Sequence, residues 1–161
     1  MDEVERLCAL LDREVEVCGT LTAVLRDEQD AMVARRPEAI LLCVEQRGLL
    51  GEQLTSLASA RRDVVASIAT AHGAPTAEAI AVLPLLPPAP QARLRDRVRR
   101  LRAALLEARS LERQNAYLAR ASLDHVTDLL QTLRALVPGA RYDANATLTV
   151  PDAPDRLSQR A

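Results

Sequence analysis

The sequence predicts an all-α protein, built from an antiparallel coiled-coil hairpin and a longer third helix. Apolar residues recur with heptad spacing, and long stretches without Pro or Gly are separated by short breaks. The 161 residues include no Trp, no Phe and two Tyr, so seams of Leu, Val and Ala are favoured over a large aromatic core. We expect a single elongated three-helix bundle over residues 1–137 and a flexible tail over residues 138–161.

The first helix is expected over residues ~2–34, a segment with no Pro. Asp2, with Glu5 three residues on, resembles a capping box. Two heptad rows follow from the apolar spacing. One row is Val4, Leu11, Cys18, Leu25 and Met32, and the other is Leu7, Glu14, Leu21 and Glu28. Two glutamates therefore occupy positions that should face another helix.

A short break at Arg35-Arg36-Pro37-Glu38 separates the first helix from a second, expected over residues ~38–72. Pro suits the first turn of a helix, and a break this short permits only an antiparallel turn. Gly73 is a typical C-terminal cap. The seam row of the second helix is Ile40, Cys43, Arg47, Leu50, Leu54, Leu57, Arg61, Val64 and Ile68. Two positions of this row are again charged, and both are arginine.

The charged seam positions match when the two helices are paired. In an antiparallel hairpin that turns near Pro37, facing residues have position numbers that add up to about 75. Glu28 then faces Arg47 and Glu14 faces Arg61, while the apolar positions face one another. A slip by one heptad would bury unpaired charges at roughly 3–5 kcal/mol each, so these four residues are predicted to fix the register. The rival interpretation, acid–base or metal chemistry, is disfavoured because the two glutamates lie about 21 Å apart on one helix.

The rest of the chain predicts a connector, a long helix and a tail. A short connector helix is expected over residues ~76–82, and prolines at 84, 87, 88 and 90 should prevent continuous helix after it. Residues ~91–137 contain no Pro or Gly and predict the longest helix, with apolar ends and a polar middle around Glu112 and Asn115. Residues 138–161 contain two prolines after the helix-ending Pro138 and no helical period, which indicates a flexible tail.

Composition and motifs disfavour several classes of function. The formal net charge is −1, the charged N-terminus differs from a signal peptide, and no apolar run approaches the ~20 residues of a membrane span. We therefore expect a soluble, cytoplasmic protein without membrane insertion, in which Cys8, Cys18 and Cys43 are reduced, buried thiols. His72 and His125 have no ligands at metal spacing, and Ser122 with His125 has no third catalytic member. We therefore expect that the protein is not an enzyme and that it binds no metal and no cofactor.

Residues 93–102, with six arginines, could indicate nucleic-acid binding. These arginines flank the stripe of Leu94, Val98 and Leu101, and stacking aromatics are absent. The acidic N-terminal segment can pair with them. A solvated or cross-helix-paired face is favoured, so we expect no nucleic acid, and a phosphate-binding patch is the alternative.

The far end of the third helix predicts a binding surface for a partner protein. Its apolar stripe continues beyond the length that two ~50 Å helices can cover, and uncovered apolar helix surface usually marks a partner site. The alternative is that the connector, residues 76–86, covers this end. The expected binding residues on the helix and in the tail are Val126, Leu129, Leu130, Leu133, Leu136, Val137, Tyr142, Leu148 and Val150.

The chain also resembles the FlgN family of flagellar export chaperones. The resemblance is carried by "LTAVLRDEQDAM" at 21–32, Pro37-Glu38-Ala39-Ile40, "QRGLLGEQLTSLASARRDVV" in the second helix, "ERQNAYLARASLDHVTDLLQTL" in the third, and "ARYDA" with Tyr142 after it. Two features depart from the family pattern: the second Asn expected near 118–119 is Leu or Ala, and the usual Gly after the Tyr segment is missing from "DANA" at 143–146.

The resemblance implies a cytoplasmic chaperone that binds the hook–filament junction proteins, keeps them unpolymerised and delivers them to the flagellar export gate. By that analogy the substrate binds the C-terminal part of the third helix, and Tyr142 and the tail take part in docking. Two other classes stay open: a structural coiled-coil tether, and a nucleic-acid-associated protein that uses residues 93–102. The sequence also leaves the oligomeric state open, a homodimer included.

Overall fold

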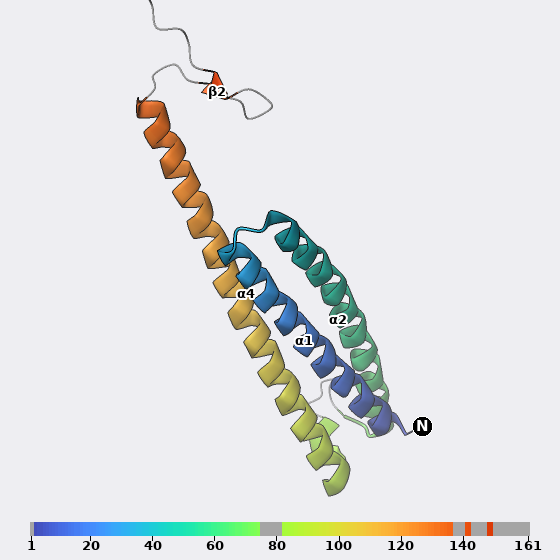
Figure 1. Cartoon of the computed structure of the whole chain (residues 1–161). Coiled ribbons are helices and arrows are strands. Elements are labelled where there is room, and N and C mark those ends of the chain that lie inside the picture. Colours follow the sequence, from blue (N-terminus) through green and yellow to red (C-terminus); the bar gives the residue numbers. More distant parts are fainter. Residues whose placement is uncertain (1, 75–81, 137–140, 143–147, 150–161) are drawn as a thin grey trace, which may run out of the picture. The chain divides into compact units, whose positions relative to one another are not determined.

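Three long helices make up the described part of the fold, which covers residues 2–74, 82–136, 141–142 and 148–149 of a computed structural model. The helices are α1 (Glu3–Val33), α2 (Pro37–Ala71) and α4 (Pro88–Leu136), and a single 3₁₀ turn, η1 (Leu83–Leu85), precedes α4. Two short strands, β1 (Arg141–Tyr142) and β2 (Leu148–Thr149), pair antiparallel. The all-α prediction is confirmed, with this minimal strand pair as an addition (Figure 1).

The chain divides into two compact units, Met1–Leu118 and Ala119–Ala161. The expected division at residue 137 stays a prediction. The expected connector helix over ~76–82 lies outside the described residues, except for Val82.

The turn between α1 and α2 ends the first helix with a left-handed residue. Arg35 has φ 53°, and the backbone N–H of Arg36 donates to the carbonyl of Ala31 over 2.9 Å. Together with the bond from the Arg35 N–H to the Met32 carbonyl, 3.1 Å, this is a Schellman cap. Such a cap normally uses glycine, because a Cβ is disfavoured in the left-handed region. Pro37 then occupies the first position of α2, as predicted.

The ends of α2 and α4 follow from glycine and proline chemistry. Gly73 has φ +64°, and the N–H of Ala74 donates to the carbonyl of Ala69 over 2.9 Å, so Gly73 caps α2 as predicted. The helix α4 begins at Pro88 and includes Pro90, so its start lies earlier than the predicted start at ~91. Proline is tolerated in the first turn because its missing N–H would have no helical partner there.

Both predicted ion pairs are present along the seam between α1 and α2. Nη1 of Arg47 lies 2.9 Å from each carboxylate oxygen of Glu28. Nε of Arg61 lies 3.1 and 2.9 Å from the two oxygens of Glu14. The carboxylate side chains are 2% and 4% exposed, while the arginines are about one-third exposed, at 35% and 30%. The desolvated carboxylates are therefore neutralised by bases whose outer parts stay in water.

The fully buried residues of α4 form a single heptad row, beside which Ala104, Leu105 and Leu111 pack as partly buried residues. Its buried residues are Leu94, Leu101, Ala108 and Asn115, each seven positions after the last. On α1, the buried residues Val17, Val24 and Ala31 also repeat every seven positions, outside the rows predicted to face α2. Helix α1 thus buries more than one face, which the pairing with α2 alone does not explain.

Asn115 connects all three helices. Its Nδ2 donates to the backbone carbonyl of Leu25 over 2.8 Å and to Oε2 of Glu28 over 3.0 Å. Because Glu28 also pairs with Arg47, one polar cluster joins α1, α2 and α4. The side chain of Asn115 is buried, and its Oδ1 has no hydrogen-bond partner among the described residues. The polar middle of α4 is thus a structural contact, which fixes where this helix meets the hairpin.

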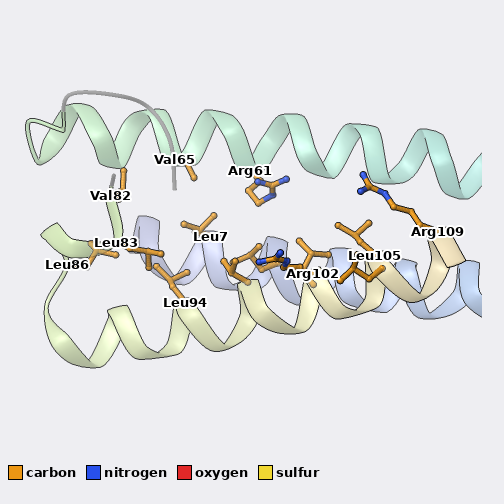
Figure 2. A pocket seen from close by; sticks show the side chains of 14 residues that line it. Leu7, Arg61, Val65, Val82, Leu83, Leu86, Leu94, Arg102, Leu105 and Arg109 are labelled. Carbon is orange, nitrogen blue, oxygen red and sulfur yellow. The ribbon is translucent and has the colours of Figure 1, made fainter. Parts of the chain in front are cut away.

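The main core lies at the opposite end of the hairpin from the turn. Val82 and Leu86, from the segment before α4, pack there with Leu7, Ile68 and Leu94. Figure 2 labels Val82, Leu86, Leu7 and Leu94. A second, smaller cluster of Leu21, Leu25 and Ala108 lies between this core and the turn. These contacts hold the first part of α4 within the unit Met1–Leu118.

Candidate partner-binding site

The C-terminal part of α4 presents a continuous face of exposed apolar side chains. We call the set of Leu123, Val126, Leu129, Leu130, Leu133 and Leu136 the C-terminal apolar face. Their exposed fractions are 65%, 50%, 53%, 37%, 40% and 72%. Every residue of α4 from 119 to 136 is exposed. Single exposed apolar side chains are common on protein surfaces, but six on one face of a helix indicate a binding surface.

The helical spacing places these six residues together. They recur at intervals of three and four residues, so they share one side of an α-helix. Asp124, Asp128 and Gln131 project from the opposite side. Thr127 and Thr132 donate their hydroxyls to backbone carbonyls four residues earlier, both over 2.9 Å. The result is an amphipathic helix with an available apolar side.

Five of the predicted binding residues, Val126, Leu129, Leu130, Leu133 and Leu136, lie on this face, and their binding role stays a prediction. Sequence reasoning missed Leu123, although it precedes Val126 by three residues and Leu130 by seven. The heptad row used for the prediction passes through Ser122 at this level of the helix. It therefore omits Leu123, which belongs to the wider apolar face of a helix with 3.6 residues per turn.

The remaining predicted residues follow the helix. Tyr142 of β1 and Leu148 of β2 are partners in the antiparallel strand pair. Val137 and Val150 lie outside the described residues. The strand pair brings the backbones of Tyr142 and Leu148 together, although they are separated by five residues in the sequence.

The alternative in which the connector covers the apolar end of α4 finds no support in the described residues. Val82 and Leu86 are buried against Leu7 and Leu94, within the unit that ends at Leu118. Residues 76–81 of the connector lie outside the described residues. The described part of the connector therefore covers the beginning of α4.

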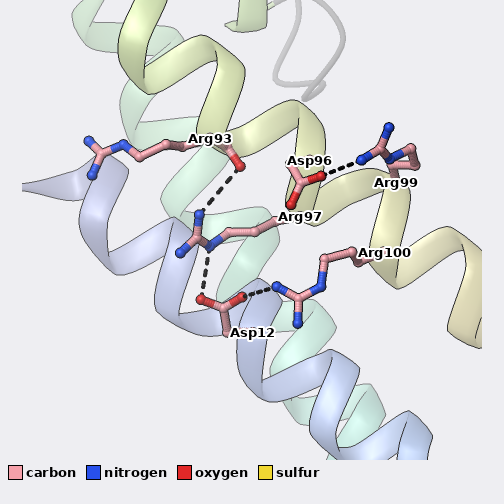
Figure 3. A network of polar contacts seen from close by, with 6 residues as sticks. All are labelled: Asp12, Arg93, Asp96, Arg97, Arg99 and Arg100. Atoms are coloured by element: carbon pink, nitrogen blue, oxygen red, sulfur yellow. Dashed lines mark hydrogen bonds and ion pairs between the residues drawn. The ribbon is translucent and has the colours of Figure 1, made fainter.

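The arginine-rich segment 93–102 is partly neutralised by the hairpin. Nε of Arg97 donates to Oδ2 of Asp12 over 2.8 Å, and Arg100 lies 3.8 Å from the other oxygen (Figure 3). Arg99 pairs with Asp96 on its own helix at 2.5 Å. The hydrogen bond that Arg97 donates to Asp12 raises the pKa of Arg97 above its usual value. Among the described residues the other three arginines of the segment, at 93, 95 and 102, form no ion pair.

The three thiols are buried and free of disulfides. Burial raises the pKa of Cys8, Cys18 and Cys43 above the ordinary value of 9.0. Arg97 and Arg93 partly oppose this at Cys8, whereas nearby carboxylates raise the pKa of all three thiols. For Cys43 these carboxylates are Asp27 and Glu28. The thiols are therefore protonated at neutral pH and have the character of core residues rather than nucleophiles.

The described residues contain no group of three potential metal ligands from His, Cys, Asp and Glu. None of the helices in the described part of the chain is long and apolar enough to cross a membrane.

Comparison with known proteins agrees with this architecture. The model of the family described as "FlgN protein" matches residues 1–149, nearly the whole chain. No curated protein matches the chain, and no solved structure does. FlgN proteins are flagellar export chaperones, and a match of this extent shows membership. The protein that presents the C-terminal apolar face thus belongs to the FlgN family of flagellar export chaperones.

Proposed function

We propose that this protein binds the hook–filament junction proteins through the C-terminal apolar face, keeps them unpolymerised in the cytoplasm and delivers them to the flagellar export gate. The observation that carries the proposal is the exposure of six apolar side chains on one side of α4. Family membership supports a chaperone of hook-associated proteins in general. The face supplies a physical means of binding.

An amphipathic helix is a common ligand and receptor in peptide recognition, with apolar anchors spaced three and four residues apart. Proteins that polymerise through amphipathic helices would have those helices masked by binding here. Burying one exposed leucine contributes on the order of 1.5–3 kcal/mol, so several anchors suffice for a stable complex. The contact would extend beyond the end of α4 through Val137, Tyr142, Leu148 and Val150.

The first experiment is co-expression of the full chain with the organism's junction proteins, followed by co-purification. We expect a soluble complex with the full chain and a weaker one with a chain that ends at Val137. If no junction protein co-purifies with the full chain, the proposal is wrong.

The second experiment places charges on the face. L129D/L133D should weaken binding by about 100-fold or more, since two buried leucines are lost at about 1.5–3 kcal/mol each. The matched control is Q131D/A135D, which adds two carboxylates at the same spacing on the opposite side of the same exposed helix. Equal loss of binding in the two variants would show that the apolar face is not the contact. An export assay with L129D/L133D then tests delivery, since the junction proteins should fail to be secreted.

A further inference from the structure

A second apolar surface lies within Met1–Leu118, in the space between α2 and α4. This space, the α2–α4 groove, has a volume of about 380 Å³. The space is lined by Leu7 and Leu11 of α1, Val65 of α2, and Val98 and Leu105 of α4. Figure 2 labels Leu7, Val65 and Leu105 among the lining side chains. None of its lining residues belongs to the C-terminal apolar face.

On the α4 side of the groove, one heptad row is fully buried and the neighbouring apolar positions are only partly covered. Leu94, Leu101 and Ala108 are buried against the hairpin. Val98 and Leu106, which line the groove, are left 38% and 54% exposed. The apolar side chains of α4 that the hairpin leaves exposed are therefore available to a further helix.

Arginines border this apolar space, and no acidic residue of the described part of the chain lines it. Arg102 and Arg109 are both exposed groove residues of α4, and neither forms an ion pair among the described residues. Arg61, on the α2 side, already pairs with Glu14. The available positive charge of the groove is therefore that of Arg102 and Arg109, which lie seven residues apart, or about 10 Å along the helix.

We propose that the α2–α4 groove binds an amphipathic helix of a partner protein, with apolar residues facing the groove and acidic residues flanking them. The α4 side extends from Leu94 to Arg109, about 22 Å, which matches about four helical turns. Two arginines two turns apart are complementary to acidic residues seven positions apart on such a helix. A small ligand with a single anionic group would pair with only one of them. The proposal does not depend on the binding of junction proteins at the C-terminal apolar face.

The test uses a fluorescein-labelled 18-residue helical peptide with leucines at heptad seam positions and glutamates on both flanks. Its matched partner carries lysines in place of the glutamates, with the same leucines. Fluorescence anisotropy with the full chain should show binding of the glutamate peptide and at least tenfold weaker binding of the lysine peptide. Equal binding of the two peptides would overturn the proposed charge complementarity.

A charge reversal locates the site. R102E/R109E should weaken the glutamate peptide at least tenfold and strengthen the lysine peptide. The control R95E/R113E makes the same change in charge at two exposed positions of α4 that do not line the groove, and it should leave both affinities within twofold. Equal effects of the two double variants would show general electrostatics and overturn the site. Circular dichroism confirms that each variant is folded.

A further variant tests the apolar part of the groove and distinguishes other occupants. L106S removes a half-exposed leucine and should weaken the glutamate peptide at least threefold. If sedimentation instead shows that L106S or R102E/R109E dissociates a dimer, while the peptide is unaffected, the occupant is a second copy of this chain and the proposal is wrong. R102E/R109E should still co-purify with junction proteins, and L129D/L133D should still bind the peptide, so failure of one proposal is distinguishable from failure of the other.

Discussion

Glu28 is the most constrained charge in the described part of the protein. Its carboxylate is 2% exposed and accepts hydrogen bonds from Arg47 of α2 and Asn115 of α4. The partner guanidinium is 35% exposed and retains contact with water. Losing the base should therefore cost more than losing the acid, because only the carboxylate would be left as an unpaired buried charge.

We predict that Arg47→Leu destabilises the protein by about 3–5 kcal/mol and that Glu28→Leu destabilises it by less. The double variant should recover much of the loss, since two leucines can pack at this level of the seam. Urea unfolding of the four proteins gives the coupling energy. Additive effects in this cycle would show that the pair does not act as a unit.

Arg35 adopts a left-handed conformation at the end of α1. We predict that Arg35→Gly raises the free energy of unfolding by about 0.5–1 kcal/mol, because glycine removes the Cβ penalty at φ 53°. Arg36→Gly is the control, since Arg36 has φ −106° and gains nothing from glycine. Thermal unfolding of both variants tests this, and equal stabilisation by Arg36→Gly would show that relief of the left-handed backbone is not the cause.

The buried thiols predict a dependence of stability on alkaline pH. Because the folded-state pKa of Cys8, Cys18 and Cys43 is raised above 9.0, the unfolded state loses these protons first as the pH rises. Their contribution is fully present below pH 9.0 and is lost as the pH rises through the folded pKa values. Urea unfolding between about pH 8 and 10 should show a decrease that is smaller when all three cysteines are replaced by alanine.

The fully buried row of helix α4 includes the small residue Ala108. It is 3% exposed and packs against Leu21 and Leu25. We predict that Ala108→Leu destabilises the protein by about 1–3 kcal/mol through overpacking. Ala103→Leu, at an exposed position of the same helix, should change stability by less than about 0.5 kcal/mol. Similar urea midpoints for the two variants would show that α4 does not pack closely against α1 at Ala108.

The hairpin could be predicted in detail because a short turn fixes which residues face each other. Once the turn is placed near Pro37, the position numbers of facing residues add up to about 75. This sum alone pairs Glu28 with Arg47. Helix α4 follows a connector of unknown path, so the sequence could not say which of its two heptad rows is buried. Of the stripe Leu94, Val98 and Leu101, the first and last residues are buried, whereas Val98 is 38% exposed. The proline-rich start of α4 was misplaced because prolines inside the first turn resemble prolines before it.

The two compact units predict different hydrogen-exchange behaviour. Residues 119–136 are all exposed, so their amides should exchange faster than those of α1 and the first part of α4. Binding of a junction protein should slow exchange at residues 123–136 in particular. Exchange measured by mass spectrometry tests this, and protection of these residues in the free protein would mean that the C-terminal apolar face is already covered.

The candidate site was only partly accessible from the sequence. The apolar stripe after Val126 could be identified because it extends beyond the length of its partner helices. Leu123 was missed, since a strict heptad row passes through Ser122. Tyr142 and Leu148 pair in strands of only two residues each. Strands this short leave no hydrophobic period in the sequence, so the sequence predicted only a tail.

The distribution of the seam charges has a consequence for biosynthesis. Both seam acids lie on α1 and both seam bases lie on α2, so two copies of α1 cannot pair without burying carboxylates that have no cation. On a polysome, α1 emerges from the ribosome before its partner, and the 35 residues of α2 take about 2–7 s to synthesise. During that interval the two glutamates oppose association with the α1 segments of neighbouring nascent chains, and α1 stays available for the helix that follows it.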